Sequence, residues 1–500
     1  MEQGGARDGR QPLPRNFSSV FGINRARRES SSLRDAISPQ SAMSYPQLED
    51  LKSTHQPACV RARAIFGVML MPHSKILVCS CLVATLTVLG AQFARAQAPT
   101  PAGAPTEAPA GFDTPSFNAA HSVSNGLVEP PGDTFARDQQ VFEQNKSVAD
   151  GLGPVYNATS CVMCHQNPNS GAAGQVTELR VGHNDANGNF VNPTIPINDG
   201  KNTITGRSIV NDRAIGPQAQ EHIPETENIR ALRATLNTLG DGFVEAIDDS
   251  TLIAIAAAQP KLSEGRVNGE VVQAPIFEAP GQTRVGRFGW KDQHSSLLSF
   301  IADAYLNEMG ITSRLRPTEV TTVLLTTAGI NDQPDDLGLE DIDHFAQFVR
   351  GTMVPPRDTA LAATPAAARG EALFTHIGCN VCHVQTITTA PAGTVIDGGM
   401  FVIPAALGNK IIHPYGDFLL HDIGTGDGIV QVGPQDTANK LRTAPLWGVR
   451  EKARFMHDLR SLSLENAIVR HEGEAREAAR RFGQLSPEDR EALITFLRTL

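Results

Sequence analysis

The chain has 500 residues, of which 40% are hydrophobic and 19% are charged, so it has enough apolar mass for one large or two ordinary domains. This composition excludes a collagen, a peptide hormone and a wholly disordered chain. A formal net charge of −10, with only four Tyr and two Trp, does not provide the interleaved basic and aromatic surface of a nucleic-acid binder, and we expect no nucleic-acid partner. The seven Cys are too few for a disulfide scaffold of this length, so their spacing is the more useful observation.

An apolar stretch over residues 76–91 has the features of an export signal. It follows Lys75 and precedes Ala94-Arg95-Ala96, the small-x-small pattern that signal peptidase cleaves. The alternative is a short membrane anchor, but the stretch is below the ~20 apolar residues that a bilayer-spanning helix needs. We therefore predict a signal peptide over residues 69–96, a periplasmic location, and no stable membrane span after cleavage.

The position of this signal has consequences for its neighbours. A signal peptide begins near the N-terminus, so we expect translation to start at Met69 or Met71 and residues 1–68 to be a mis-annotated or disordered extension. Subtracting the 12 Lys or Arg and 6 Asp or Glu of residues 1–96 from totals of 43 and 53 leaves 31 basic and 47 acidic residues. The resulting charge of −16 favours a basic redox partner. The Pro/Ala-rich residues 97–130 are expected to form a linker.

Every Cys beyond the predicted signal lies in a C-x-x-C-H pentapeptide, at residues 161–165 and 379–383. Two thiols three residues apart on a helical turn reach the two vinyl groups of one haem, and the imidazole of the next residue then lies beneath the iron. We therefore predict two covalently bound haem c groups. The predicted thioether residues are Cys161, Cys164, Cys379 and Cys382, and the predicted proximal iron ligands are His165 and His383.

Other uses of these cysteines explain the pattern less well. A thioredoxin-like dithiol needs no following His and is expected once, in a βαβ setting. A four-cysteine zinc site leaves both histidines without a function. Structural disulfides do not require the same pentapeptide twice.

Amphipathic segments surround the haem motifs. Residues 366–374 read as a helix leading into the second pentapeptide, and a final helix is expected after Ser486, a good N-cap. A helix at each end of a haem segment resembles a class I cytochrome c. We predict a mainly α fold with two cytochrome c-like haem domains, over residues 131–355 and 356–500. The N-terminal domain is expected to be elaborated with long loops, because about two hundred residues separate the motifs.

An ordered series of motifs accompanies the pentapeptides. It comprises residues 157–160 (NATS), 286–291 (GRFGWK), 307–313 (NEMGITS), 420–422 (LHD) and 442–448 (RTAPLWG), with His457 and His471 in the tail. This series resembles the di-haem oxidoreductase family, which is similar to the bacterial di-haem cytochrome c peroxidases. The resemblance covers about residues 130–500.

The resemblance implies two catalytic residues. Trp290 looks like the tryptophan that conducts the electron between the haems, and Glu308 looks like the glutamate that acts on bound peroxide. A partly buried carboxyl group with a raised pKa can remove a proton from one oxygen and return it to the other. Alternatively, Glu308 simply ends a helix that begins near Ser296, and Met309 is a rival candidate as an axial ligand. Phe300 stands where the peroxidases usually carry Gln, a departure that leaves a different oxidant or substrate open.

His471 is the candidate distal ligand of the second haem. It shares one helical face with Leu464, Ile468 and Phe482 in a helix expected over residues 463–482. A buried imidazole needs a partner, which is either the haem iron or a hydrogen bond within the core. In the related peroxidases the residue at the matching spacing after the motif histidine is usually Met, so a replacement of Met by His is implied, with a lower haem potential.

The remaining candidates are weaker. His183 lies in a polar loop and is more typical of a surface residue than of a distal ligand of the first haem. His421 and Asp422 fit either a haem propionate or a structural role, as does His457. Ca²⁺ is possible but not predicted, because Lys452 and Arg454 replace the peroxidase residues that lend it carbonyl oxygens.

The sequence thus predicts an exported di-haem c-type cytochrome, an oxidoreductase that reduces peroxide at the N-terminal haem with electrons from the C-terminal haem. The expected electron donor is a small protein, either a c-type cytochrome or a cupredoxin, or a small molecule. The alternatives are a non-catalytic electron-transfer cytochrome and a di-haem oxidase or oxygenase of a small organic substrate.

Overall fold

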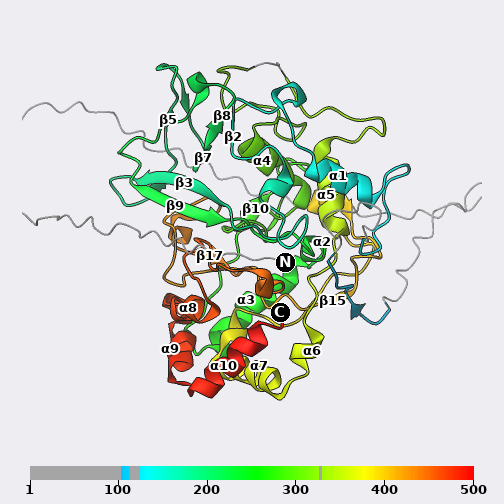
Figure 1. The fold of residues 1–500 in the computed structure, drawn as a ribbon, viewed down its shortest axis with the longest axis vertical. Helices are drawn as coiled ribbons and strands as arrows, with labels where there is room; N and C mark the ends of the chain where they lie inside the picture. The colour runs from blue at the N-terminus through cyan, green and yellow to red at the C-terminus, as the bar shows by residue number, and fades with distance from the viewer. Residues whose placement is uncertain (1–102, 113–123, 326–328) are drawn as a thin grey trace, which may run out of the picture. The chain divides into compact units, whose positions relative to one another are not determined.

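The computed structural model describes residues 103–112, 124–325 and 329–500 (Figure 1). The predicted extension, the signal peptide and parts of the predicted linker lie outside these residues. Helices account for 31% of the described residues and strands for 15%, so the prediction of a mainly α fold is wrong. The segment between the two pentapeptides causes the difference. It lacks the long runs of helical periodicity that helices require, and much of it folds into hairpins and short strands.

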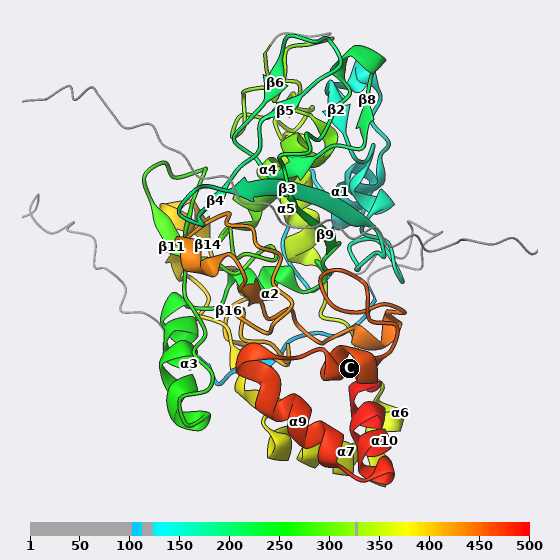
Figure 2. The ribbon, with the colours of Figure 1, turned by 90° about the vertical axis from the view of Figure 1, so that its left-hand side faces the viewer.

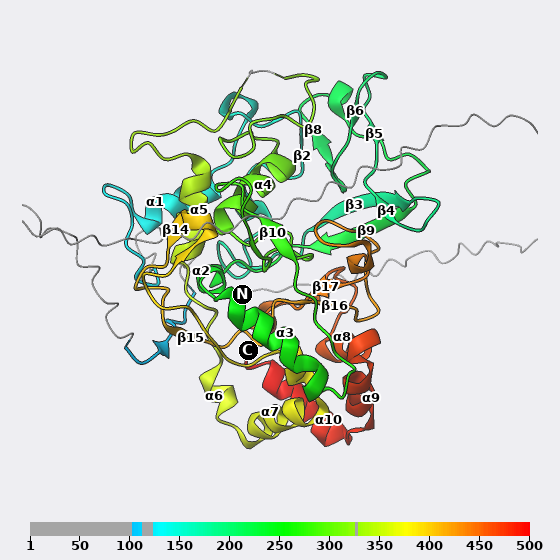
Figure 3. The same cartoon turned by 180° about the vertical axis from the view of Figure 1, so that it is seen from behind.

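Three helices carry the packing around the first pentapeptide. They are α1 (Phe135–Glu143), α4 (Leu297–Met309) and α5 (Asp341–Gly351), and α1 lies against α5 in Figures 1 and 3. The hydroxyl of Thr134 caps α1 by accepting the N–H of Arg137. Aromatic rings join the two helices, since the ring of Phe142 lies 4.8 Å from that of Phe348, centre to centre.

A second group of helices contains α7, the helix that leads into the second pentapeptide. Helix α7 (Pro365–Ile377) packs on α10 (Pro487–Leu497), whose predicted N-cap, Ser486, is confirmed by its bond from the N–H of Asp489. The two backbones approach closely at Gly370, where a Cβ would lie 2.0 Å from the carbonyl oxygen of Ala492. Three further helices, α6 (Thr359–Ala362), α8 (Leu464–Val469) and α9 (Arg476–Gln484), complete this group, and all are labelled in Figure 1, with α6 and α9 also in Figure 2.

The largest sheet is built around β3 (Thr177–Asn184). It pairs antiparallel with β9 (Ile229–Ala234), β7 (Ile209–Val210) and β4 (Phe190–Val191). Along the β3–β9 pair, Glu178 lies opposite Arg233. Because side chains alternate along a strand, Glu178 and Arg180 lie on the same face of β3.

Short elements fill the remaining chain. The paired strands are β2 (Val155–Tyr156) with β8 (Arg213–Ala214), β5 (Ile195–Pro196) with β6 (Thr203–Ile204), β10 (Gln273–Pro275) with β11 (Thr283–Val285), β13 (Val395–Ile396) with β14 (Phe401–Val402), and β16 (Leu420–His421) with β17 (Leu441–Arg442). Two helices lie between α1 and α4 in the chain, α2 (Asp241–Glu245) and α3 (Asp249–Leu262).

Residues of the predicted linker pair with a distant part of the chain. Strand β1 (Thr106–Glu107) runs parallel to β15 (Lys410–Ile412), whose other edge pairs with β12 (Ile387–Thr388). The N–H of Gly111 also donates to the carbonyl of Val354 at 3.0 Å. This part of the linker is therefore held by backbone hydrogen bonds.

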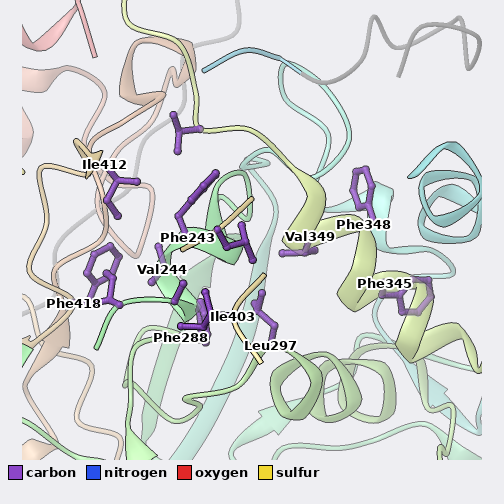
Figure 4. Packing of buried hydrophobic residues seen from close by; sticks show 14 of the residues in the cluster. Phe243, Val244, Phe288, Leu297, Phe345, Phe348, Val349, Ile403, Ile412 and Phe418 are labelled. Atoms are coloured by element: carbon purple, nitrogen blue, oxygen red, sulfur yellow. The ribbon is translucent and has the colours of Figure 1, made fainter. Parts of the chain in front are cut away.

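One hydrophobic core joins segments from both predicted domains. Figure 4 shows Phe288 and Leu297 beside Ile403, and Phe418 nearby, all buried. A smaller core lies between the helices around α7 and α10. The predicted domain boundary at residues 355 and 356 remains a prediction. No helix in the described part of the chain is long and apolar enough to cross a membrane.

Candidate functional sites

Both pentapeptides form the same helical turn. In each, a short 3₁₀ turn begins at the first Cys, and the N–H of the His donates to the carbonyl of that Cys, at 3.0 Å for His165 and 2.9 Å for His383. The preceding helix supplies a phenylalanine whose ring centre lies 6.3 Å from that of His165 and 6.2 Å from that of His383. These rings belong to Phe142 and Phe374. The repeated turn sets two thiols and one imidazole on the wall of a cavity.

The first cavity has a volume of about 730 Å³ and contains the residues predicted for catalysis. Cys161, Cys164 and His165 line it together with Trp290 and Glu308. Burial lowers the pKa of His165 to about 4, although a backbone hydrogen bond at Leu236 opposes the shift. The imidazole is therefore neutral at ordinary pH, the form that binds a metal.

Glu308 lies in a carboxyl pair that the sequence did not reveal. It is the penultimate residue of α4, and its Oε2 accepts the Nδ2–H of Asn157 at 2.8 Å. Glu178 of β3 forms a hydrogen bond with it and is itself held by the guanidinium of Arg180, one of whose bonds measures 3.1 Å. Burial, and then the charge of Glu178, raise the pKa of Glu308 well above its usual range.

This pairing indicates how the two carboxyl groups share their charge. Interaction with Arg180 overcomes the effect of burial and lowers the pKa of Glu178, so Glu178 is the ionised member and Glu308 holds the proton. The arrangement provides a buried acid at the cavity wall. No sequence motif marks Glu178 or Arg180, and the only available signal was their i, i+2 spacing in a strand-like segment.

The second cavity, of about 270 Å³, is lined by Cys379, Cys382, His383 and His471. The ring centres of His383 and His471 are 6.5 Å apart. An imidazole nitrogen binds a metal at about 2 Å and the ring centre lies roughly 1 Å beyond it, so two imidazoles on opposite sides of one metal have ring centres about 6 Å apart. The Nδ1–H of His383 donates to the carbonyl of Tyr415 at 2.9 Å, and that of His471 to Ala467 at 2.8 Å. Each ring thereby keeps Nε2 available.

His471 lies at a break between helices, where the sequence pattern predicted one helix over residues 463–482. Helix α8 ends at Val469 and α9 begins at Arg476. Gly473 adopts a positive φ of 50°, and a Cβ there would lie 2.3 Å from the carbonyl oxygen of Asp422. The prediction of a continuous helix is wrong because this close approach interrupts it.

Trp290 lines both cavities. Its Nε1–H donates to the carbonyl of Ala234 at 2.8 Å, and its ring lies 6.0 Å from that of His457. The surrounding loop turns at Gly289, which has a φ of 78°, and the backbone N–H of Arg442 donates to the carbonyl of Trp290 at 2.9 Å. The indole is therefore held at the wall that the two cavities have in common.

Comparison with known proteins identifies the family. The model of the family described as "Di-haem oxidoreductase, putative peroxidase" matches residues 185–500. The chain belongs to this family. The predicted resemblance is thus confirmed, and haem is the cofactor that the family implies. The match includes Trp290, Glu308 and the second pentapeptide, and the first pentapeptide precedes it.

Two solved structures are similar at low identity to this di-haem oxidoreductase. One is a MauG-like protein associated with microbial copper homeostasis, at 16% identity and a TM-score of 0.27, with 53% of this chain and 89% of that chain covered. The other is hydrazine synthase of Kuenenia stuttgartiensis, at 16% identity and a TM-score of 0.22. The match covers 33% of this chain and 56% of the hydrazine synthase chain. No curated protein matches.

Of the other predicted candidates, Phe300 and Met309 line the first cavity and His183 does not. Phe300 lines the first cavity and stacks on Phe288. Met309 lines the same cavity, as does Gln293, which no sequence motif marks. The Nδ1 of His183 lies 2.8 Å from a carboxyl oxygen of Glu227, and His183 is not part of the cavity wall.

Four of the remaining candidates, His421, Lys452, Arg454 and His457, line the second cavity, and Asp422 does not. The two ring nitrogens of His421 contact Asp417 at 2.9 Å and Glu474 at 2.8 Å. Burial lowers the pKa of His421, but the charge of Asp417 outweighs it and raises that pKa well above its usual value. His457 is buried, which lowers its pKa to about 4, and Lys452 lines the same cavity. His421 therefore has both ring nitrogens occupied by carboxylates of the protein at the cavity wall.

Proposed function

We propose that this chain is an exported di-haem c-type oxidoreductase that reduces peroxide at the first cavity, with electrons that enter at the second. The observation that carries the proposal is the contrast between the cavities, which share Trp290. The second is bounded by two imidazoles with their Nε2 atoms available, whereas the first brings one imidazole together with a protonated carboxyl group.

The residues of both sites fit haem c. Cys161 and Cys164 would hold one haem through thioether bonds, with His165 as the proximal ligand. Cys379 and Cys382 would hold the second haem in the same way, and His383 and His471 would bind its iron. When bound, the haems supply the iron-based redox chemistry that amino-acid side chains lack.

The chain's own residues manage the protons. Reduction of one hydrogen peroxide to two waters consumes two electrons and two protons. The Glu308 carboxyl holds a proton at the wall of the first cavity, where the amide of Asn157 fixes its Oε2. Ionised Glu178, held by Arg180, keeps that proton on Glu308 and can accept a hydrogen bond from it. Phe300 and Phe288 supply an apolar wall that limits water.

The electrons come from outside the chain. We propose a small donor, either a c-type cytochrome, a cupredoxin or a small molecule, which delivers them at the second cavity. Trp290 would provide the route to the first cavity, because it lines both. The periplasm is the proposed location, since the predicted signal peptide and the predicted haem c attachment are both typical of exported proteins.

Absorption spectra of the purified haem-loaded protein, oxidised and half-reduced, test this proposal. We expect one low-spin haem that is inert to cyanide and one haem whose spectrum changes with cyanide and with hydrogen peroxide. Peroxide should also be consumed in the presence of a reduced donor. Two low-spin haems inert to both ligands would instead establish a pure electron-transfer cytochrome. Ligand binding without peroxide turnover would favour an oxidase or oxygenase of an organic substrate.

A further inference from the structure

A second cluster of ligand-type residues lies where α1 begins and α5 packs against it. It contains Asp133, which precedes the N-cap of α1, Asp138 within α1, and His344 of α5. The side chains of both aspartates are fully buried and that of His344 is 2% exposed. Their possible ligand atoms lie within 4.8 Å of one another. This cluster is separate from the residues that line the two cavities.

Buried carboxylate oxygens in this cluster have no hydrogen-bond donor. Oδ1 of Asp133 accepts the N–H of Thr134 at 2.8 Å, and Oδ1 of Asp138 accepts the Nδ1–H of His344 at 2.6 Å. Within the described part of the chain, the Oδ2 atoms of both aspartates have no donor, and neither do the two carboxyl oxygens of Glu129. Burying such an oxygen without a partner costs free energy, so each one calls for a compensating group.

His344 is oriented as metal-binding histidines usually are. Its Nδ1 lies 2.6 Å from Asp138 and 3.5 Å from Oδ2 of Asp133, and its Nε2 lies 3.0 Å from Oδ2 of Asp335. Asp335 is itself fixed, because its Oδ1 accepts the N–H groups of Leu337 at 2.8 Å and Leu339 at 3.0 Å. A carboxylate that holds the outer nitrogen of a histidine is typical of metal sites.

Carboxyl groups outnumber imidazoles at this site. Glu129, Asp133 and Asp138 bring three carboxyl groups to one imidazole. A divalent cation would give the buried carboxylate oxygens that lack a donor a partner.

We propose that Asp133, Asp138 and His344 bind one divalent first-row metal ion of the range Mn²⁺ to Zn²⁺, with Glu129 as an additional oxygen ligand. One imidazole with several carboxylates suits these ions, whereas Ca²⁺ and Mg²⁺ prefer oxygen ligands alone. The ion would join α1 to α5. Since α1 also carries Phe142 against His165, the site would stabilise the helix pair that supports the first haem motif.

Metal titration of the haem-loaded protein tests the site. The protein is treated with EDTA, dialysed, and titrated calorimetrically with MnCl₂ or ZnCl₂, and bound manganese and zinc are then quantified so that haem iron is not counted. We expect one equivalent per chain and a higher unfolding temperature with the ion bound. The double variant Asp133→Asn/Asp138→Asn should lose this binding. Asp336→Asn is the matched control, because Asp336 is exposed and bonds to Arg137 beside the cluster, and it should bind as the wild type does.

A milder variant covers the case in which the double variant does not fold. Asp335→Asn keeps all proposed ligands and changes only the partner of His344 Nε2, so its affinity should fall by roughly 10–100-fold. Absence of saturable Mn²⁺ and Zn²⁺ binding by the wild type would overturn the proposal, as would unchanged binding by Asp335→Asn together with the double variant. Binding of Ca²⁺ alone would overturn the assignment of His344 as a ligand.

Discussion

The regions around the two pentapeptides begin alike and differ in the other side chains that line their cavities. Each has a helix whose phenylalanine contacts the pentapeptide histidine, and each has a second helix packed on the first, α5 on α1 and α10 on α7. In the wall of its cavity, the C-terminal region presents His471 with a fixed Nδ1, whereas the N-terminal region presents Glu308 paired with Glu178. Under the proposed function, each pentapeptide would hold a haem, and the other residues of its cavity would decide whether the site transfers electrons alone or also transfers protons.

The largest expected effect is on the acid of the N-terminal region. Glu308→Gln should lower the rate of peroxide reduction by roughly 10²–10⁴-fold, because general acid–base catalysis contributes about that much, and leave the spectra of both haems unchanged. The wild-type rate should fall as the pH rises through the raised pKa of Glu308, since the proton is then lost, and the variant should lack that fall. Stopped-flow rates across pH measure both.

A matched control distinguishes a catalytic role of Glu308 from the effect of substituting any partly buried glutamate. Glu319 is another partly buried glutamate that accepts a bond from an asparagine amide, at 3.1 Å from Asn331, and it does not line either cavity. Glu319→Gln should keep the wild-type rate. An equal loss of rate in both variants would contradict the catalytic assignment of Glu308.

Substitution of His471, in the second cavity, should change the reduction potential of the second haem and not a proton transfer. In His471→Met we expect the second haem potential to rise by on the order of 0.1–0.3 V, because axial ligands set haem potentials over about 0.8 V and Met ligation raises them. Spectroelectrochemical titration measures the shift, and His376→Met, an exposed substitution in α7, is the control. An unchanged potential and spectrum would remove His471 from the iron.

Trp290, which lines both cavities, should affect the rate of electron transfer between the two haems. Trp290→Phe should slow electron arrival at the first haem severalfold without changing either potential, since the indole lines both cavities. Flash reduction followed at the two haem absorption bands gives the rate. Trp447→Phe removes the other, buried tryptophan and should leave the rate unchanged. Equal rates in wild type and Trp290→Phe would exclude the indole as the route.

The smallest effect concerns stability and the control residue itself. Burial raises the pKa of Glu319 from 4.5 to about 7, so the folded state binds a proton that the unfolded state has lost. The stabilisation is complete below about pH 4.5 and is lost as the pH rises through 7. Glu319→Gln should therefore raise the unfolding temperature above pH 7 and flatten its pH dependence, as thermal unfolding at several pH values would reveal.

The sequence was most informative where chemistry constrains spacing. The C-x-x-C-H turns, the family and the cap at Ser486 could all be predicted, because bond lengths and cap hydrogen bonds fix the residue types. The fold class could not, since the strands between the motifs are mostly two or three residues long and leave little periodicity. Glu178 escaped notice for a related reason, because a charged residue on a strand is ordinary until its tertiary neighbour, Glu308, is known.

The pairing of β1 with β15 orders the assembly of the chain. Thr106 pairs with Lys410, 304 residues later, so this parallel strand pair cannot form until most of the polypeptide has been made. Both pentapeptides precede Lys410 in the chain, so under the proposed function haem attachment can precede this pairing. Because the strand pair forms late, its loss should speed unfolding more than it slows folding.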